Sequence, residues 1–181
     1  MKQRFRLESK DRTSGFSFQE KAGKSRLITE QLESLDEFKS SQDICIYVSK
    51  SDEVQTHELI INMLGNKNVL VPLTQEEGLK IVQLKSFEEL NPGAFGILEP
   101  PNREEHIGEP DMIITPGQAF DVAGYRLGRG LGYYDKYLKN LEAIKVGLTF
   151  DENLLDEVPT EEHDVPMDII ITDKRVLRFD T

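Results

Sequence analysis

The feature that most constrains the fold of this 181-residue chain is a series of short apolar runs rich in β-branched residues. The clearest of them are 43–48 (DICIYV), 68–72 (NVLVP), 111–115 (DMIIT), 143–149 (AIKVGLT) and 168–172 (DIIIT). Runs this short and apolar are typical of strands buried on both faces. Helical or irregular stretches separate them, which predicts an α/β fold: a mainly parallel sheet with helices on both faces, forming a three-layer α/β/α single domain.

The stretches between the strands give further expectations. Residues 18–39 have helical spacing, and a second helix runs from about Thr56 to Gly65-Asn66, a pair suited to a left-handed C-terminal cap. Residues 79–84 and 174–179 are candidate additional strands, whereas the Pro-, Gly- and Glu-rich segment 91–110 is expected to be irregular. The predicted core contacts of the first helix are Ala22, Leu27, Ile28, Leu32, Leu35 and Phe38.

The amino-acid composition limits the classes of partner that the protein can bind. A net charge of −11 argues against a general nucleic-acid binder, and no apolar run reaches membrane-spanning length. The charged start of the chain does not fit the apolar core of a secretory signal. Cys45 is the only cysteine, which excludes an intrachain disulfide and a thiolate metal cluster. We therefore expect a cytoplasmic protein without nucleic-acid or membrane partners, and expect Cys45 to be a small buried core residue.

Charge is unevenly distributed, since residues 1–26 carry eight basic and three acidic side chains. This basic segment is either an ordinary solvated helix or an element that folds over an anionic ligand. Lys2 and Arg6 are one helical turn apart, so both can point at one anion.

Ligands of parallel α/β sheets gather at the carboxyl ends of the strands. Glu53 follows the first predicted strand, residues 116–135 follow the strand at 111–115, and Asp151 follows the strand at 143–149. These three segments are expected to share a cleft, in which Glu53 is either a solvated loop residue or an acceptor for ligand N–H groups.

Residues 126–135 (RLGRGLGYYD) carry the strongest chemical signal. Gly128, Gly130 and Gly132 let the backbone turn tightly and approach a ligand, and amides at a helix start form an anion site. Arg126, Arg129 and Lys136 add cationic donors. Ordinary turns also contain alternate glycines, so spacing alone leaves both interpretations open. The pattern is neither the dinucleotide fingerprint nor a Walker loop.

The helix after this loop can be oriented by its periodicity. Tyr134, Tyr137, Leu138 and Leu141 follow helical spacing and should face the core. Tyr133 lies off that stripe and is the better candidate for ligand contact. Asp135, in the first turn, either complements the helix dipole or ligates magnesium beside phosphates.

Residues 112–138, with PGQAFD followed by GYRLGRGLGYYDKYL, resemble the signature of the 5-formyltetrahydrofolate cyclo-ligase (5,10-methenyltetrahydrofolate synthetase) family. The resemblance extends over nearly the whole chain, through the K-x-x-x-R of Lys2 and Arg6, SKSDEVQT at 49–56, FGILEP at 95–100, and the closing pattern at 159–172 with His163-Asp164. The chain departs from the family at Leu131, where Gly or a polar residue is usual, and at Phe95, where Trp is common.

The resemblance implies ATP- and Mg²⁺-dependent conversion of 5-formyltetrahydrofolate to 5,10-methenyltetrahydrofolate, with release of ADP and phosphate, through phosphorylation of the formyl oxygen. ATP is then a co-substrate, and Mg²⁺ the only cofactor. It also implies one cyclo-ligase-like α/β domain over residues 1–181, a monomer, with the basic helical segment 1–40 near the nucleotide. Polyglutamate preference stays open.

Site roles follow from the same resemblance, residue by residue. The predicted catalytic residues are Arg126, Arg129 and Tyr133. The predicted ATP-binding residues are Lys2, Arg6, Arg126, Gly128, Arg129, Gly130, Leu131, Gly132, Tyr133 and Tyr134. The predicted folate-binding residues are Val48, Glu53 and Tyr133. The predicted magnesium ligands are Asp135 and Asp164, the latter being alternatively a turn residue.

Two residues outside these sets have structural interpretations. Asp121 stabilises its own loop, and His163 orients the turn around Asp164, with a general-acid role as the alternative for His163. Two other functions stay open. One is a sugar-phosphate isomerase or CoA-transferase-like enzyme, which would work without ATP. The other is a non-catalytic folate- or nucleotide-binding protein, an interpretation that the side chain of Leu131 keeps open.

Overall fold

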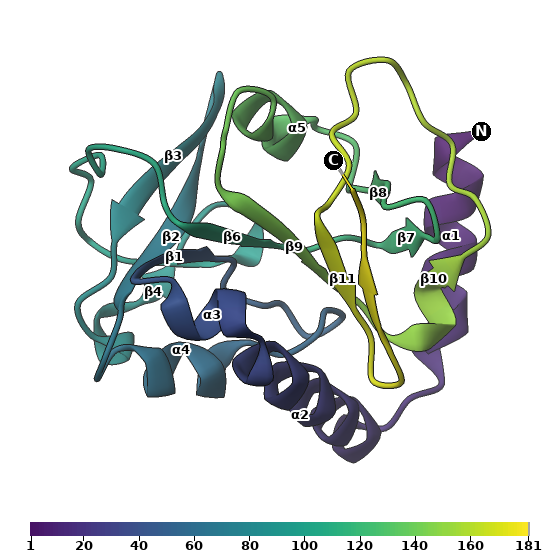
Figure 1. Ribbon diagram of the computed structural model, residues 1–181, viewed down its shortest axis with the longest axis horizontal. Coiled ribbons are helices and arrows are strands. Elements are labelled where there is room, and N and C mark those ends of the chain that lie inside the picture. The colour runs from purple at the N-terminus through teal and green to yellow at the C-terminus, as the bar shows by residue number, and fades with distance from the viewer. Residues whose placement is uncertain (181) are drawn as a thin grey trace.

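The predicted apolar strands form the centre of a seven-stranded sheet in the computed structural model, which describes residues 1–180 (Figure 1). The strand order is β12-β11-β9-β6-β1-β2-β3. Neighbours from β11 through β2 are parallel, while β12 and β3 pair antiparallel at the two edges. The strands are β1 (Asp43–Ile46), β2 (Asn68–Gln75), β3 (Gly78–Gln83), β6 (Met112–Thr115), β9 (Ile144–Leu148), β11 (Ile169–Ile171) and β12 (Val176–Arg178).

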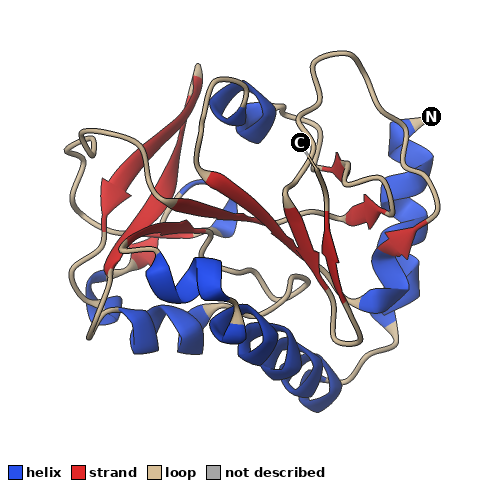
Figure 2. Ribbon diagram, viewed as in Figure 1, coloured by secondary structure: helices blue, strands red, loops and turns tan. Residues whose placement is uncertain are grey.

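Helices α2 (Phe18–Ser34), α3 (Asp36–Ser40) and α4 (His57–Met63) lie together on one face of this sheet (Figures 1 and 2). A capping box starts α2: the Ser17 side chain accepts from the Glu20 amide, and the Glu20 carboxylate accepts from the Ser17 amide. Ile28 and Leu32 of α2 belong to the same buried cluster as Ile44 of β1 and Ile114 of β6.

The predicted helix at 18–39 is two helices, because Leu35 has an extended backbone that separates α2 from α3. Four of its predicted core residues are buried, namely Ile28, Leu32, Leu35 and Phe38. The predictions for Ala22 and Leu27 are wrong, since both are exposed. The buried face of α2 starts at a polar residue, Ser25, whose hydroxyl accepts a hydrogen bond from the Gln55 amide. Because Ser25 is not hydrophobic, the spacing of apolar residues did not reveal which face of the helix is buried.

The predicted left-handed cap at Gly65-Asn66 is also wrong. Neither residue has a positive φ, and the C-cap residue of α4, Leu64, is right-handed. The helix end is closed instead by the amides of Asn66 and Lys67, which both donate to the Met63 carbonyl.

The opposite face of the sheet is covered by α5 (Tyr133–Leu138) and by a three-stranded sheet of order β10-β7-β8. Its strands are β7 (Ala119–Asp121), β8 (Arg126–Leu127) and β10 (Leu154–Leu155), and α1 (Lys2–Ser14) runs beside it (Figure 1). Cys45 is buried on this face with Phe120 and Leu138, and burial raises the pKa of its thiol. The α/β single domain is confirmed, with one short helix and a small sheet supplying its second outer layer.

The segment between β3 and β6 is largely irregular, as predicted. It contains two 3₁₀ turns and one short hairpin: η1 (Phe87–Glu89), η2 (Ala94–Gly96), β4 (Asn91–Pro92) and β5 (Leu98–Glu99). A third 3₁₀ turn, η3 (Asp151–Asn153), follows β9. None of the helices within residues 1–180 combines the length and apolarity that crossing a bilayer requires.

Candidate active site

A cavity of about 510 Å³ opens at the carboxyl ends of β1 and β6. Glu53 and the 126–135 loop both line it, which confirms that these segments share a cleft. Every predicted site residue, whether assigned to ATP, folate or metal, lies in its wall. The described lining residues are Lys2, Arg6, Tyr47, Val48, Lys50, Glu53, Pro72, Thr74, Leu79, Phe95, Ile97, Pro116, Gly117, Arg126–Asp135, Glu161, His163 and Asp164.

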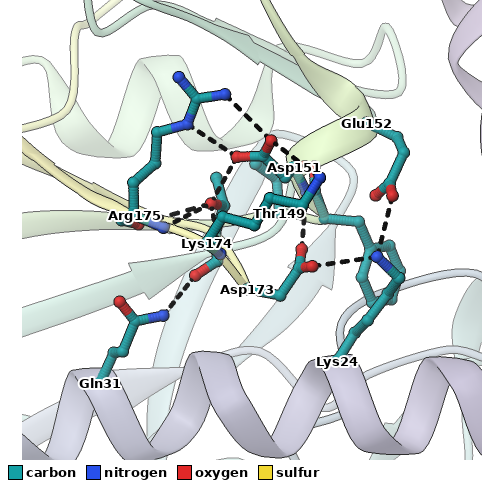
Figure 3. Close-up of polar contacts among 10 residues, drawn as sticks. Lys24, Gln31, Thr149, Asp151, Glu152, Asp173, Lys174 and Arg175 are labelled. Atoms are coloured by element: carbon teal, nitrogen blue, oxygen red, sulfur yellow. Dashed lines mark hydrogen bonds and ion pairs between the residues drawn. The ribbon is translucent and has the colours of Figure 1, made fainter.

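Asp151 does not line the cavity, so the prediction that it shares the cleft with Glu53 and the glycine loop is wrong. Its carboxylate accepts hydrogen bonds from the Arg175 guanidinium at 2.8 and 3.0 Å and from the Thr172 hydroxyl at 2.8 Å (Figure 3). Lys24 of α2 binds Glu152 and Asp173 nearby at 2.9 and 3.0 Å. The η3 turn carries the chain after β9 toward α2, so this group joins the β11–β12 hairpin to that helix.

The glycine-rich loop has the conformation that its glycines predict. Gly130 has φ +107° and Gly132, the N-cap of α5, has φ +67°. A side chain at Gly128 would place its Cβ 2.9 Å from Nη1 of Arg126. The loop therefore turns tightly around Arg126, while the Leu131 side chain is 55% exposed and lies at the cavity wall without blocking the loop backbone.

Arg126 is the most enclosed cation of the cavity wall, with a side chain that is 4% exposed. Its Nη2 lies 3.1 Å from the Asp135 carboxylate, and its guanidinium carbon lies 5.2 Å from the centre of the Tyr134 ring. Its Nε has no hydrogen-bond partner among residues 1–180. Arg126 is suited to an anion, because a guanidinium group in a cavity wall can donate charge-assisted hydrogen bonds.

The start of α1 closes one side of the cavity. Arg6 donates from Nε to the Gly128 carbonyl at 2.8 Å, and its guanidinium lies against Gly130. Lys2 donates from Nζ to Asp164 at 2.8 Å and lies 3.4 Å from Glu161. The basic helix α1 therefore packs on the glycine loop, while its folding over an anionic ligand stays a prediction.

Arg129 pairs across the cavity with two consecutive carboxylates. Its Nη2 lies 2.9 and 3.0 Å from the two oxygens of Asp52 and 3.0 Å from Oε1 of Glu53. Burial alone would lower the pKa of Arg129, but the carboxylates of Glu53 and Asp52 outweigh it and raise that pKa. Asp52 is absent from the sequence-predicted site, although its position beside Glu53 after β1 was the available signal.

The phase of α5 separates its two tyrosines as predicted. Tyr134 packs against the core cluster of the second sheet face, and burial raises its pKa well above the ordinary value. Tyr133 lines the cavity and belongs to none of the buried clusters of the described chain. Tyr134 nevertheless reaches the cavity too, beneath Arg126.

The predicted metal ligands are acidic groups that already hold cations. Asp135 pairs with Arg126, and Asp164 pairs with Lys2. Burial alone would raise the pKa of Asp164, but the Lys2 ammonium and the Glu161 amide outweigh it and lower that pKa. Glu161, His163 and Asp164 place ligand atoms within 4.8 Å of one another. Asp164 shares this group with Glu161 and His163, whereas Asp135 lies on α5 beside Arg126. Carboxylate oxygens beside a cationic loop fit Mg²⁺ bound jointly by protein and phosphate oxygens.

Asp121 stabilises its own loop, as expected. Its carboxylate accepts from the amides of Ala123, Tyr125 and Val158, and the side chain is buried. His163 contacts Glu161 at 3.1 Å and lies 3.8 Å from Asp164, so it lies within the turn that it was predicted to orient.

Part of the cavity lining was not predicted. It comprises Tyr47, just after β1, Pro72 and Thr74 of β2, Leu79 of β3, and Phe95 and Ile97 of the irregular segment. Pro72 lies beyond the last pair of β1 and β2, Cys45 with Leu70, so no β1 residue needs the N–H that proline lacks. This largely apolar set adds a second chemical character to the charged lining of the cavity.

Comparison with known proteins matches residues 1–173 to the model of the 5-formyltetrahydrofolate cyclo-ligase family. The chain belongs to this family. A 5-formyltetrahydrofolate cyclo-ligase of Mus musculus is 32% identical over 94% of this chain and 92% of its own length. Another, from Mycolicibacterium smegmatis, is 35% identical over 75% of this chain and 76% of its own length.

Solved structures agree with this membership. The NMR structure of Aquifex aeolicus 5,10-methenyltetrahydrofolate synthetase has a TM-score of 0.88 and 34% identity, covering 98% of this chain and 92% of its own. The synthetase from Mycoplasma pneumoniae has a TM-score of 0.75 over 95% of this chain and 98% of its own. At 22% identity, that second likeness supports the fold alone.

Proposed function

We propose that this enzyme closes 5-formyltetrahydrofolate to 5,10-methenyltetrahydrofolate while ATP is converted to ADP and phosphate. The observation that carries the proposal is the lining of one cavity of about 510 Å³, which combines a cationic glycine loop, the Glu53 carboxylate and apolar side chains. The loop suits the triphosphate, and Glu53 with the apolar side chains suits a flat pterin whose N–H groups need an acceptor. Membership of the cyclo-ligase family supports the same pairing of substrates.

The need for ATP follows from the chemistry of the formyl group. A formamide oxygen is a poor leaving group. In the proposed first step the formyl oxygen attacks the γ-phosphorus, an O–P bond forms, and the bond from phosphorus to the bridging oxygen breaks to release ADP. N10 then attacks the formyl carbon and loses its proton. The C–O bond breaks, and phosphate leaves with the former formyl oxygen.

The chain's own residues would align these atoms and offset the developing charge. Arg126, a charged donor enclosed in the cavity wall, would hold the transferred phosphoryl group. Gly128–Gly132 amides, Lys2, Arg6 and Arg129 would hold the triphosphate. Glu53 would accept from the pterin, beside Val48, and Tyr133 would lie where nucleotide and folate meet.

Mg²⁺ is proposed as the cofactor, held by Asp135 and Asp164 together with phosphate oxygens. When bound, it would neutralise phosphate charge and help to orient the γ-phosphate. Both carboxylates would then exchange an ion-pair partner, because each now contacts a cationic side chain of the cavity wall.

An absorbance assay tests the function. The protein is mixed with 5-formyltetrahydrofolate and Mg-ATP in mildly acidic buffer, and the methenyl product is followed. We expect product only when ATP is present, with one ADP formed per methenyl group. Folate binding without product would favour the non-catalytic alternative, and the lack of both folate binding and product would favour the isomerase-like one.

Several expectations stay predictions alongside this function. They are the cytoplasmic location, the monomeric state, the absence of nucleic-acid and membrane partners, and the extent of one domain over 1–181 with segment 1–40 beside the nucleotide. Sedimentation of the active enzyme would test the oligomeric state.

A further inference from the structure

The ion pair between Arg129 and Glu53 joins two segments that line the cavity. Arg129 belongs to the glycine loop, whereas Glu53 follows β1. The contact therefore links the group proposed for phosphate to the group proposed for the pterin.

Both oxygens of Glu53 are already engaged. Oε1 contacts Arg129 at 3.0 Å, and Oε2 accepts the Lys50 amide at 2.8 Å. A pterin presents adjacent N–H donors, which need a carboxylate with free lone pairs. The Lys50 amide is part of the local turn, since the Glu53 amide donates back to the Lys50 carbonyl. Arg129 is the partner that can leave.

Asp52 supplies a second acceptor for the same guanidinium group. Its two oxygens lie 2.9 and 3.0 Å from Nη2 of Arg129, and its side chain is 37% exposed, compared with 10% for Glu53. Arg129 can thus rotate away from Glu53 while it keeps one carboxylate partner. A phosphate at the glycine loop would be a further anionic partner for the same guanidinium group, in competition with Glu53.

We propose that Arg129 is a switch between Glu53 and the nucleotide, with Asp52 as its positioning residue, so that ATP and 5-formyltetrahydrofolate bind with positive coupling. The inference rests on the proposed function. Without nucleotide, Arg129 competes with the pterin for Glu53; with nucleotide, Glu53 is released. Reciprocity requires folate to tighten nucleotide binding by the same factor.

The test is calorimetric titration of 5-formyltetrahydrofolate with and without a β,γ-imido ATP analogue and Mg²⁺. For the wild type we expect the analogue to lower the folate Kd by about two- to fivefold, the range for a partly exposed ion pair. Arg129→Gln should tighten folate binding in the absence of nucleotide and abolish the coupling. Asp52→Asn should act in the opposite direction, weakening folate binding without nucleotide, because Arg129 then has Glu53 alone.

Arg178→Gln is the matched control, since Arg178 pairs with Glu37 on the surface and is not part of the cavity wall. It should match the wild type. An unchanged or weaker folate Kd for Arg129→Gln without nucleotide overturns the switch, as does a wild type without coupling. Failure of the proposed function looks different: the wild type would then bind no folate or form no product.

Discussion

At the scale of single residues, the site depends on how each charge is held. Arg126 is enclosed by Asp135 and the Tyr134 ring, while Glu53 pairs with Arg129 in the lining of the same cavity. We propose Arg126 as the residue at the reacting phosphoryl group and Glu53 as the residue that binds folate. The assignments predict different kinetic defects.

Arg126→Ala should lower kcat by about 10²–10³-fold, the typical loss for one donor to developing charge, with a smaller effect on the KM for folate. Glu53→Ala should mainly raise the KM for folate. Steady-state kinetics with each substrate varied separates the two. An Arg126→Ala enzyme that keeps its turnover would remove this residue from the phosphoryl group, and Arg126→Lys controls for loss of charge.

Gly130 is the glycine whose replacement should be most specific to the loop. At φ +107° an L-residue is strained, and an added Cβ would lie 3.3 Å from the Arg6 guanidinium. Gly130→Ala should raise the KM for ATP, because the loop backbone and Arg6 are displaced together.

Gly15 provides the matched control for this substitution. It has φ −80°, and an added Cβ would meet no heavy atom within 4 Å. Gly15→Ala should leave ATP kinetics unchanged. Equal KM values for the Gly130→Ala and Gly15→Ala enzymes would show that the loop conformation does not depend on Gly130.

At the scale of elements, strands were predicted better than helix ends. Buried strands are short apolar runs whatever packs on them, so β1, β6, β9 and β11 lie where the sequence placed them. Helix caps and turns depend on hydrogen-bond partners that are fixed only in the folded chain. At the end of α4 the following amides donate to the Met63 carbonyl, and no left-handed cap forms at Gly65. Asp151 binds the Arg175 guanidinium and therefore lies outside the cleft.

The contact between η3 and the β11–β12 hairpin makes a stability prediction. Hydrogen bonds from Arg175 lower the pKa of Asp151 from 3.8 to about 2. A depressed pKa in the folded state contributes stability that is fully present above the unfolded value, near pH 4, and is lost as the pH falls toward 2. Asp151→Asn should therefore lower the free energy of unfolding by about 1–2 kcal/mol at neutral pH.

Urea denaturation from pH 7 to pH 2 measures this effect. The difference between wild type and Asp151→Asn should shrink as the pH falls below about 4. Asp36→Asn is the control, because that side chain is fully exposed at the surface. A constant difference across the whole range would mean that the charge of Asp151 does not stabilise the fold.

At the scale of the whole molecule, the sequence identified the loop and the sheet, but not how the cavity closes. Lys2 and Arg6 lie far from residue 130 along the chain, yet α1 brings Arg6 onto Gly128 of the loop and Lys2 onto Asp164. That contact and the hairpin wall at Pro72 and Leu79 depend on tertiary packing, which no local pattern encodes. The roles predicted for Lys2, Arg6 and Glu53 came from the family resemblance. The orientation predicted for Tyr133 came from the helical spacing of the residues that form α5.

Transfer of the formyl oxygen to phosphate is the step on which the proposed mechanism depends. It can be followed with 5-formyltetrahydrofolate carrying ¹⁸O in the formyl group, by mass analysis of the released phosphate after a single turnover with Mg-ATP. The mechanism predicts one ¹⁸O in each phosphate released. Unlabelled phosphate formed together with the methenyl product would contradict it, because the formyl oxygen would then have left by another route.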